Sequence, residues 1–101
     1  MMTLREKQSK FMFLKAFLIL HAYSLGYELT QPDCRLQHME NSLHYIGLAE
    51  DFNLFKNGVY LRKTEDHLKL GEYWESLNPL CRWGGRWGDG NHYSMEHNGV
   101  R

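Results

Sequence analysis

A chain of 101 residues, 43% hydrophobic and 14% aromatic, is long enough for one folded domain over residues 1–101. It leaves no room for a second domain with its own core. Its 12 Lys and Arg residues balance 12 Asp and Glu residues. These values exclude a disordered chain and give no overall charge that would attract nucleic acid.

The first predicted element is a helix from about Thr3 to Leu25. Thr3 and Glu6 have the spacing of a capping box, in which each side chain bonds the backbone N–H of the other residue. Gly26 supplies the helix stop. The expected buried face follows the 3–4 spacing of a helix and consists of Phe11, Leu14, Leu18, Ala22 and Leu25.

The same segment has the outline of a signal peptide, because residues 11–20 are mostly apolar and follow a basic start. Lys15 interrupts this stretch, which is also too short to cross a bilayer. We therefore expect an amphipathic helix of the mature fold, no membrane insertion, and a protein made without its own export signal.

Three further segments predict strands. Residues 27–30 form a short candidate strand, and residues 46–55 are expected to form one longer strand. On that longer strand the alternation of side chains would place three residues on one face: Ala49, Asp51 and Asn53. Asn57 and Gly58 form a strong hairpin signal before a return strand over residues 59–62.

The rest of the chain predicts one more helix, two loops and a last strand. Residues 33–43 are polar and indicate a loop with at most one helical turn, and Thr64 opens a helix that ends at Asn78-Pro79. The core contacts expected from that helix are Leu68, Tyr73, Trp74 and Leu77. Four glycines within residues 83–90 indicate a shaped loop, and residues 92–97 alternate like a strand. The order predicts an α+β fold with a small antiparallel sheet and two main helices.

His44, Asp51 and His92 are candidate metal ligands. His44 and Asp51 lie seven residues apart, which fits a His on a loop followed by a carboxylate on a strand. If the last strand neighbours the strand over 46–55, the three side chains can converge. Two imidazoles and one carboxylate leave a position of Zn²⁺ open for water, whose pKa the metal lowers to about 7. The set is therefore a candidate catalytic zinc site; the alternative from these residues alone is that each His is an ordinary surface or core residue.

Such a site needs a proton acceptor beside the water. Asp89 precedes His92 by three residues and lies between two glycines, so we predict that it is the general base. The alternative is a simple turn residue, since Asp-Gly is a common turn pair. Glu50 and Glu96 are the next candidates.

Several other residues carry two interpretations each. Trp83, Trp87 and Tyr93 either line a peptide cleft or fill a small core. Arg82 and Arg86 either bind substrate carboxylates or form solvated surface. Four histidines are interpreted as structural or solvent-facing, with His97 also a candidate partner of the metal ligands: His21, His38, His67 and His97.

The two cysteines, Cys34 and Cys81, make neither a disulfide framework nor a CxxC metal motif. We expect two separate buried thiols, and a disulfide between them is the alternative.

Two motifs resemble a known family. SLHYIGLAED, at residues 42–51, is similar to the S-x-H-x(6)-D motif of the D-alanyl-D-alanine carboxypeptidase family of zinc peptidases. WGGRWGDGNHYSMEH, at residues 83–97, resembles the closing motif of its small phage members, endolysins that cut the L-alanyl-D-glutamate bond of peptidoglycan stem peptide. REKQSKF and GYELT are also similar to the start of these enzymes.

The resemblance implies zinc held by His44, Asp51 and His92, with Asp89 as the catalytic acidic residue and peptidoglycan stem peptide as substrate. It also implies an arginine upstream of the first His that binds substrate and stabilises the oxyanion, and Arg35 is the candidate. Set beside the family pattern that the resemblance implies, the stretch from Arg35 to Ser42 looks short.

Three functions follow as hypotheses. The first is a monomeric zinc peptidase that hydrolyses peptidoglycan stem peptide, as an L-alanyl-D-glutamate endopeptidase or a D-Ala-D-Ala carboxypeptidase; we expect a phage endolysin, made in the host cytoplasm and acting on the cell wall after release. The second is a metal-binding relative with impaired catalysis that binds the wall, which the short stretch after Arg35 motivates. The third is a structural protein in which the histidines are incidental.

Overall fold

A computed structural model of the chain describes residues 1–32 and 42–101. The longest element is helix α1 (Leu4–Ser24), which begins at the predicted capping box. The Thr3 hydroxyl accepts a hydrogen bond from the Glu6 N–H at 3.1 Å, and the Glu6 carboxylate accepts one from the Thr3 N–H at 2.9 Å. The helix ends before Gly26, whose φ of 87° lies in the left-handed region.

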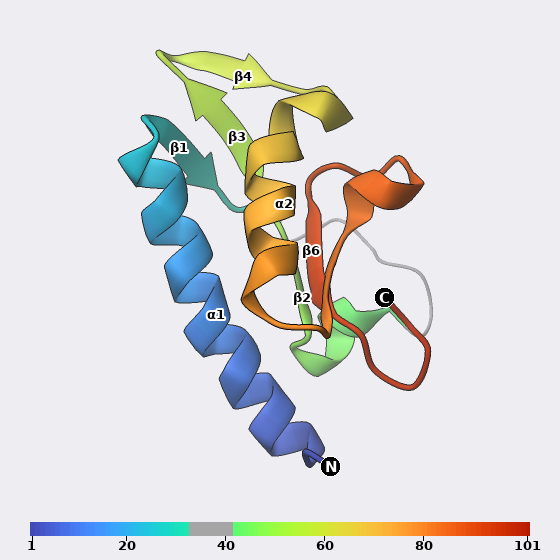
Figure 1. The fold of residues 1–101 in the computed structure, drawn as a ribbon. Helices are drawn as coiled ribbons and strands as arrows, with labels where there is room; N and C mark the ends of the chain where they lie inside the picture. Colours follow the sequence, from blue (N-terminus) through green and yellow to red (C-terminus); the bar gives the residue numbers. More distant parts are fainter. Residues whose placement is uncertain (33–41) are drawn as a thin grey trace.

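Two small antiparallel sheets follow (Figure 1). The first contains β1 (Tyr27–Thr30), β3 (Asn53–Lys56) and β4 (Val59–Leu61), in the order β1-β3-β4. The second contains β2 (Ala49–Asp51), β6 (His92–Met95) and β5 (Cys81–Trp83), in the order β2-β6-β5. The fold is therefore α+β with antiparallel pairing, as the sequence predicts, although the strands divide between two sheets.

The remaining helix of regular length is α2 (Leu68–Leu77), preceded by the 3₁₀ turn η2 (Thr64–His67). Two more 3₁₀ turns are η1 (Leu43–Ile46) and η3 (Gly84–Trp87). Helix α2 packs against α1 and β5, so that the two helices lie side by side against the sheets (Figure 1).

The single strand predicted over residues 46–55 is wrong. Residues 43–46 form η1, and the strand divides at Phe52 into β2 and β3, which belong to different sheets. The Phe52 N–H donates to the Asn91 carbonyl at 3.0 Å, and the Phe52 side chain is buried. The chain changes sheet here because Phe52 packs into the core, and Asp51 and Asn53 consequently sit in different sheets.

The hairpin signal is confirmed, since Asn57 and Gly58 have φ angles of 51° and 76° between β3 and β4. The second helix is confirmed as well, with Asn78 as its C-cap. The sequence analysis missed β5, because a three-residue strand leading into a glycine loop carries too short a pattern to identify.

The core lies between the two helices and the two sheets. Trp74 of α2 is fully buried and donates its indole N–H to the carbonyls of Arg82 and Ser94, at 3.1 and 3.0 Å. Of the predicted α1 face, four residues are buried: Phe11, Leu14, Leu18 and Ala22. Leu25 and Leu68 were expected in the core, but both lie at helix ends. Leu25 is 39% exposed and Leu68 is 42% exposed.

Among the described residues, no helix combines the length and the apolar character needed to cross a membrane. The loop predicted over 33–43 lies mostly outside the described residues. Three residues named in the sequence analysis lie outside them as well: Cys34, Arg35 and His38.

Candidate metal centre

Three elements position the predicted metal ligands. His44 lies in η1, where the Ser42 hydroxyl accepts a hydrogen bond from the His44 N–H at 3.2 Å. Gly47, with a φ of 71°, ends this turn and leads the chain toward β2. Asp51 is the last residue of β2 and pairs directly with His92, the first residue of β6. The antiparallel register therefore brings a carboxylate and an imidazole together from distant parts of the sequence.

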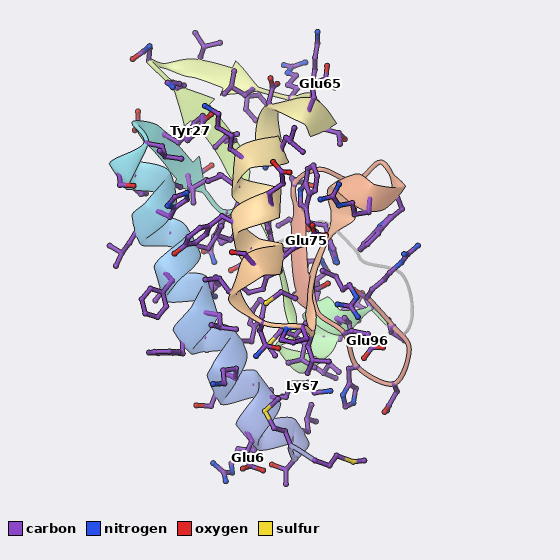
Figure 2. All side chains as sticks on the ribbon, viewed as in Figure 1. Glu6, Lys7, Tyr27, Glu65, Glu75 and Glu96 are labelled. Atoms are coloured by element: carbon purple, nitrogen blue, oxygen red, sulfur yellow. The ribbon has the colours of Figure 1, made fainter. Side chains whose placement is uncertain are left out.

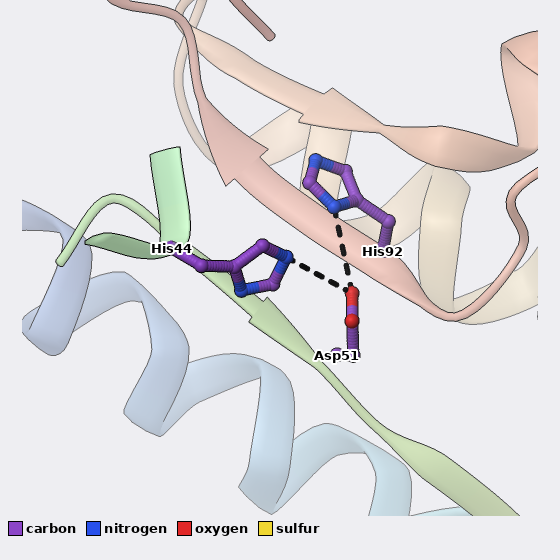
Figure 3. A group of neighbouring side chains, drawn as sticks. All are labelled: His44, Asp51 and His92. Carbon is purple, nitrogen blue, oxygen red and sulfur yellow. Dashed lines mark ion pairs between the residues drawn. The ribbon is translucent and has the colours of Figure 1, made fainter. Parts of the chain in front are cut away.

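The three side chains point toward one another (Figure 3). The Asp51 Oδ1 atom lies 3.3 Å from His44 Nε2 and 3.4 Å from His92 Nδ1. One potential ligand atom from each residue lies within 4.8 Å of the other two. The imidazole rings of His44 and His92 meet at 73°, with their centroids 5.2 Å apart.

This geometry fits a zinc ion. Zn²⁺ binds imidazole nitrogen and carboxylate oxygen at about 2.0–2.2 Å in tetrahedral geometry, which places two ligand atoms about 3.3–3.5 Å apart. The two N···O distances in the structure, 3.3 and 3.4 Å, have this value. Among the described residues, Asp51 Oδ1 is also buried without a hydrogen-bond partner. A buried acceptor without a hydrogen bond is costly unless a cation satisfies it.

Two opposing effects act on the pKa of the Asp51 carboxyl group. Burial raises the pKa, and the adjacent imidazoles of His44 and His92 lower it by more, so the net pKa lies well below the usual range. Asp51 is therefore ionised at neutral pH, which is the form that binds a metal.

Asp89 lies at the edge of this group. Its Oδ2 atom is 4.0 Å from His92 Nδ1, and its side chain is 53% exposed. Backbone hydrogen bonds hold the residue in place: its N–H donates to Gly84 at 2.8 Å, and its carbonyl accepts from the His92 N–H at 3.1 Å. The carboxylate thus stands beside the cluster and open to solvent.

Gly84 is a residue that the sequence analysis did not single out. A Cβ atom at this position would lie 2.1 Å from the Asp89 carbonyl oxygen and 2.7 Å from His92 Cβ. Gly84 therefore allows the loop to close against both residues. The signal in the sequence is the run of glycines between Trp83 and His92, whose individual roles need the loop geometry to be assigned.

The aromatic residues divide between the two interpretations. Trp83 and Tyr93 are 3% and 1% exposed and belong to the core. Trp87 is half-buried, and its ring centroid lies 5.7 Å from that of His92, in an edge-on contact. Of the three, Trp87 is the one that contacts the metal cluster.

The two arginines of this region bond to neighbouring protein groups. Arg86 donates to both carboxylate oxygens of Glu75, at 2.7–3.2 Å, and its guanidinium lies 5.2 Å from the Trp83 ring centroid. These hydrogen bonds to Glu75, and then its charge, raise the pKa of Arg86. Arg82 donates to the Pro79 carbonyl at 2.6 Å. Both arginines thus make hydrogen bonds within the protein.

The described histidines outside the cluster each have a structural contact. His67 is buried, and its Nδ1 atom lies 2.8 Å from the Tyr93 hydroxyl; burial lowers its pKa to about 4. His97 Nδ1 lies 3.0 Å from the Nζ atom of Lys7 in α1. His21 stacks on Tyr73 with ring centroids 3.8 Å apart.

The class of site is thus a two-histidine, one-carboxylate cluster with zinc-ligand spacing. The model of the D-alanyl-D-alanine carboxypeptidase family matches residues 37–95. The chain belongs to this family of peptidases. No curated protein and no solved structure matches the chain. Peptidases of this family are zinc-dependent, and the cluster of His44, Asp51 and His92 is compatible with metal binding.

Proposed function

We propose that the protein is a zinc-dependent peptidase that hydrolyses peptide bonds in the stem peptide of bacterial peptidoglycan. The observation that carries this proposal is the ligand-like spacing of His44, Asp51 and His92 in a chain of a peptidase family. Zinc bound there would supply Lewis acidity, which polarises a peptide carbonyl and activates a water molecule at neutral pH.

Asp89 is assigned the role of general base. Hydrolysis of an amide requires a group that removes a proton from the attacking water and returns one to the leaving amine. The exposed Asp89 carboxylate, 4.0 Å from His92, stands where it can reach a water at the cluster.

The other candidate bases are worse placed. Glu50 precedes Asp51 in β2, so its side chain projects from the opposite face of the strand. Its Oε1 atom accepts bonds from Lys15 Nζ at 3.3 Å and Gln31 Nε2 at 3.0 Å. Glu96 lies beyond the end of β6, beside Lys7 at the end of the molecule where α1 begins (Figure 2).

Arg35 is proposed to bind substrate and to stabilise the negative charge that develops on the carbonyl oxygen. It precedes the family match, which begins at residue 37. Since Arg86 is paired with Glu75, Arg35 is the better candidate for this role. Arg35→Ala is expected to keep zinc and to lose rate.

The substrate bond and the biological setting form the finer part of the proposal. We infer an L-alanyl-D-glutamate endopeptidase or a D-Ala-D-Ala carboxypeptidase that acts as a phage endolysin, made in the host cytoplasm and reaching the wall after release. The motif over residues 83–97 supports the phage type. The shorter stretch after Arg35 supports the second candidate, a metal-binding relative that binds the wall without turnover.

The test uses purified peptidoglycan, release of new amino groups, and mass analysis of the products. The wild-type protein with zinc should release new amino groups from the peptidoglycan. Asp89→Asn should reduce the rate of this release about 100-fold or more while the zinc content stays unchanged. Glu28→Gln is the matched control, because Glu28 is exposed on β1, in the sheet that carries none of the three candidate ligands. Full activity of Asp89→Asn would contradict the general-base role, and zinc binding without any release by the wild type would favour the inactive relative.

A further inference from the structure

The side of α1 that faces away from the rest of the protein is apolar over most of its length. Met12, Phe13, Phe17, Leu20 and Tyr23 are 59%, 59%, 43%, 70% and 50% exposed, respectively. Of the described elements, β1 reaches this side at the end of the helix, where the Tyr23 hydroxyl bonds the backbone of Leu29, and the rest of the side is uncovered (Figure 1). We call these five residues, together with Ala16, the outer face of α1. Single exposed apolar residues are ordinary, but a contiguous group of large ones marks an interaction surface.

The outer face has the pattern of a helix-packing seam. Ser9, Phe13, Ala16, Leu20 and Tyr23 follow alternating steps of four and three residues, the spacing by which one helix packs along another. Every exposed position between Met12 and Tyr23 is occupied by an uncharged residue. The partner that fits this face is therefore another apolar helix.

The area of the face agrees with a small, weak interface. Because a large aromatic side chain presents about 200 Å² when fully exposed, the observed exposures correspond to about 550 Å² of apolar surface on one chain. Two such faces together would bury at most about 1,100 Å², which is just above the roughly 1,000 Å² expected of a biological interface and within the range of weak ones. An interface of this size is consistent with association in the micromolar range.

We propose that the outer face of α1 binds the same face of a second copy of this chain, as an antiparallel helix pair. Antiparallel order places the small Ala16 opposite the large Leu20 of the other copy, and Phe13 opposite Tyr23, so that volumes complement across the seam. Parallel order would instead align the Glu6 carboxylates of the two copies, which repel.

A membrane surface is the less suitable partner. Helices that lie on a membrane have a Lys- and Arg-rich polar face opposite the apolar one. In α1, the opposite side is the buried face that packs on α2 and β1. The exposed charged residues of α1 are Arg5, Glu6 and Lys10, all at its N-terminal end.

Association through α1 leaves the metal cluster accessible. The cluster is carried by η1, β2 and β6, which lie on the other side of α1 from its outer face (Figure 1). The proposal replaces the monomer expected from the sequence and does not depend on the proposed peptidase function.

Sedimentation velocity from low to several hundred micromolar protein tests the proposal. The wild type should shift from monomer to dimer with increasing concentration, and Leu20→Glu should remain monomeric. Leu68→Glu is the matched control, because Leu68 is an exposed leucine of α2, outside the outer face of α1. This variant should dimerise as the wild type does. Ala16→Glu, at the centre of the seam, should also be monomeric, and unchanged circular dichroism would show that both variants are folded.

Three results would overturn the proposal. A wild type that stays monomeric at the highest concentration shows that the face does not bind a second copy. Equal weakening by Leu20→Glu and Leu68→Glu shows that association does not depend on α1. Binding of a monomeric wild type to phosphatidylglycerol vesicles, abolished by Leu20→Glu, assigns the face to a lipid surface instead.

Discussion

Gly84→Ala should damage the metal cluster although it replaces none of the three ligands. An added Cβ would lie 2.1 Å from the Asp89 carbonyl oxygen and 2.7 Å from His92 Cβ. The Asp89 carbonyl oxygen must move from 2.1 to at least 3.0 Å from the added Cβ, a displacement of about 0.9 Å. Because this oxygen belongs to the backbone, it cannot rotate away as the end of a flexible side chain could. Two hydrogen bonds depend on the same atoms: Asp89 N–H to Gly84, and His92 N–H to Asp89.

Overpacking of this kind costs about 1–3 kcal/mol. In a domain of this size, that cost lowers the melting temperature by about 5–20 °C. Because His92 must shift as well, zinc affinity should fall about 10-fold or more, as it does when the support of a ligand is lost. Thermal denaturation followed by circular dichroism, and zinc titration in competition with a chromogenic chelator, measure the two effects.

Gly88→Ala is the matched control in the same loop. A Cβ at Gly88 meets nothing within 4 Å, but the φ of 84° strains any L-residue. It should lower stability by about 1 kcal/mol and leave zinc affinity unchanged. If Gly84→Ala melts and binds zinc as the wild type does, the loop does not support His92 in the way described.

Three further predictions concern stability and reactivity. Cys81 is 3% exposed, and burial raises its pKa to about 12. Thiol reagents at pH 8 should therefore leave it unmodified until the protein is unfolded. Rapid labelling of Cys81 in the folded protein, located by peptide mass analysis, would contradict this prediction. Burial lowers the pKa of His67 from 6.5 to about 4, so the unfolded chain binds the proton first, and this residue should reduce the free energy of unfolding by up to about 3 kcal/mol as the pH falls from 6.5 to 4. Denaturant titrations at several pH values give the free energy of unfolding, which should depend less on pH in His67→Gln than in the wild type. An unchanged pH dependence would refute the assignment. Thr3→Ala removes the N-cap of α1 and should cost about 1 kcal/mol in chemical denaturation, whereas Thr3→Asn, which retains a capping oxygen, should cost little; equal losses would show that the cap is not the cause.

Elements with a local signal were predictable from the sequence. The capping box of Thr3 and Glu6 defines the start of α1, and Asn57-Gly58 defines the β3–β4 hairpin, because in both cases residues close in the sequence make the decisive contacts. The candidate ligands His44, Asp51 and His92 were also named from the sequence, and the structure brings them together.

Features that depend on distant contacts were not predictable. The break at Phe52 depends on its hydrogen bond to Asn91 and on its burial in the core, so an unbroken strand pattern over 46–55 gave the wrong sheet assignment. Helix α1 was predictable except at its end. The 3–4 spacing identified Phe11, Leu14, Leu18 and Ala22 as the buried face, whereas the exposure of Leu25 at the C-cap depends on where the packed part of the helix stops.

The central claim is that His44, Asp51 and His92 bind one zinc ion. Elemental analysis of protein incubated with zinc and then desalted tests it most directly, with His44→Ala and His92→Ala beside the wild type and with His21→Ala as the control outside the cluster. The account predicts one zinc per chain in the wild type and in His21→Ala, and a strong loss in the other two variants. A wild type without bound zinc, or His44→Ala and His92→Ala variants that retain it in full, would contradict the account.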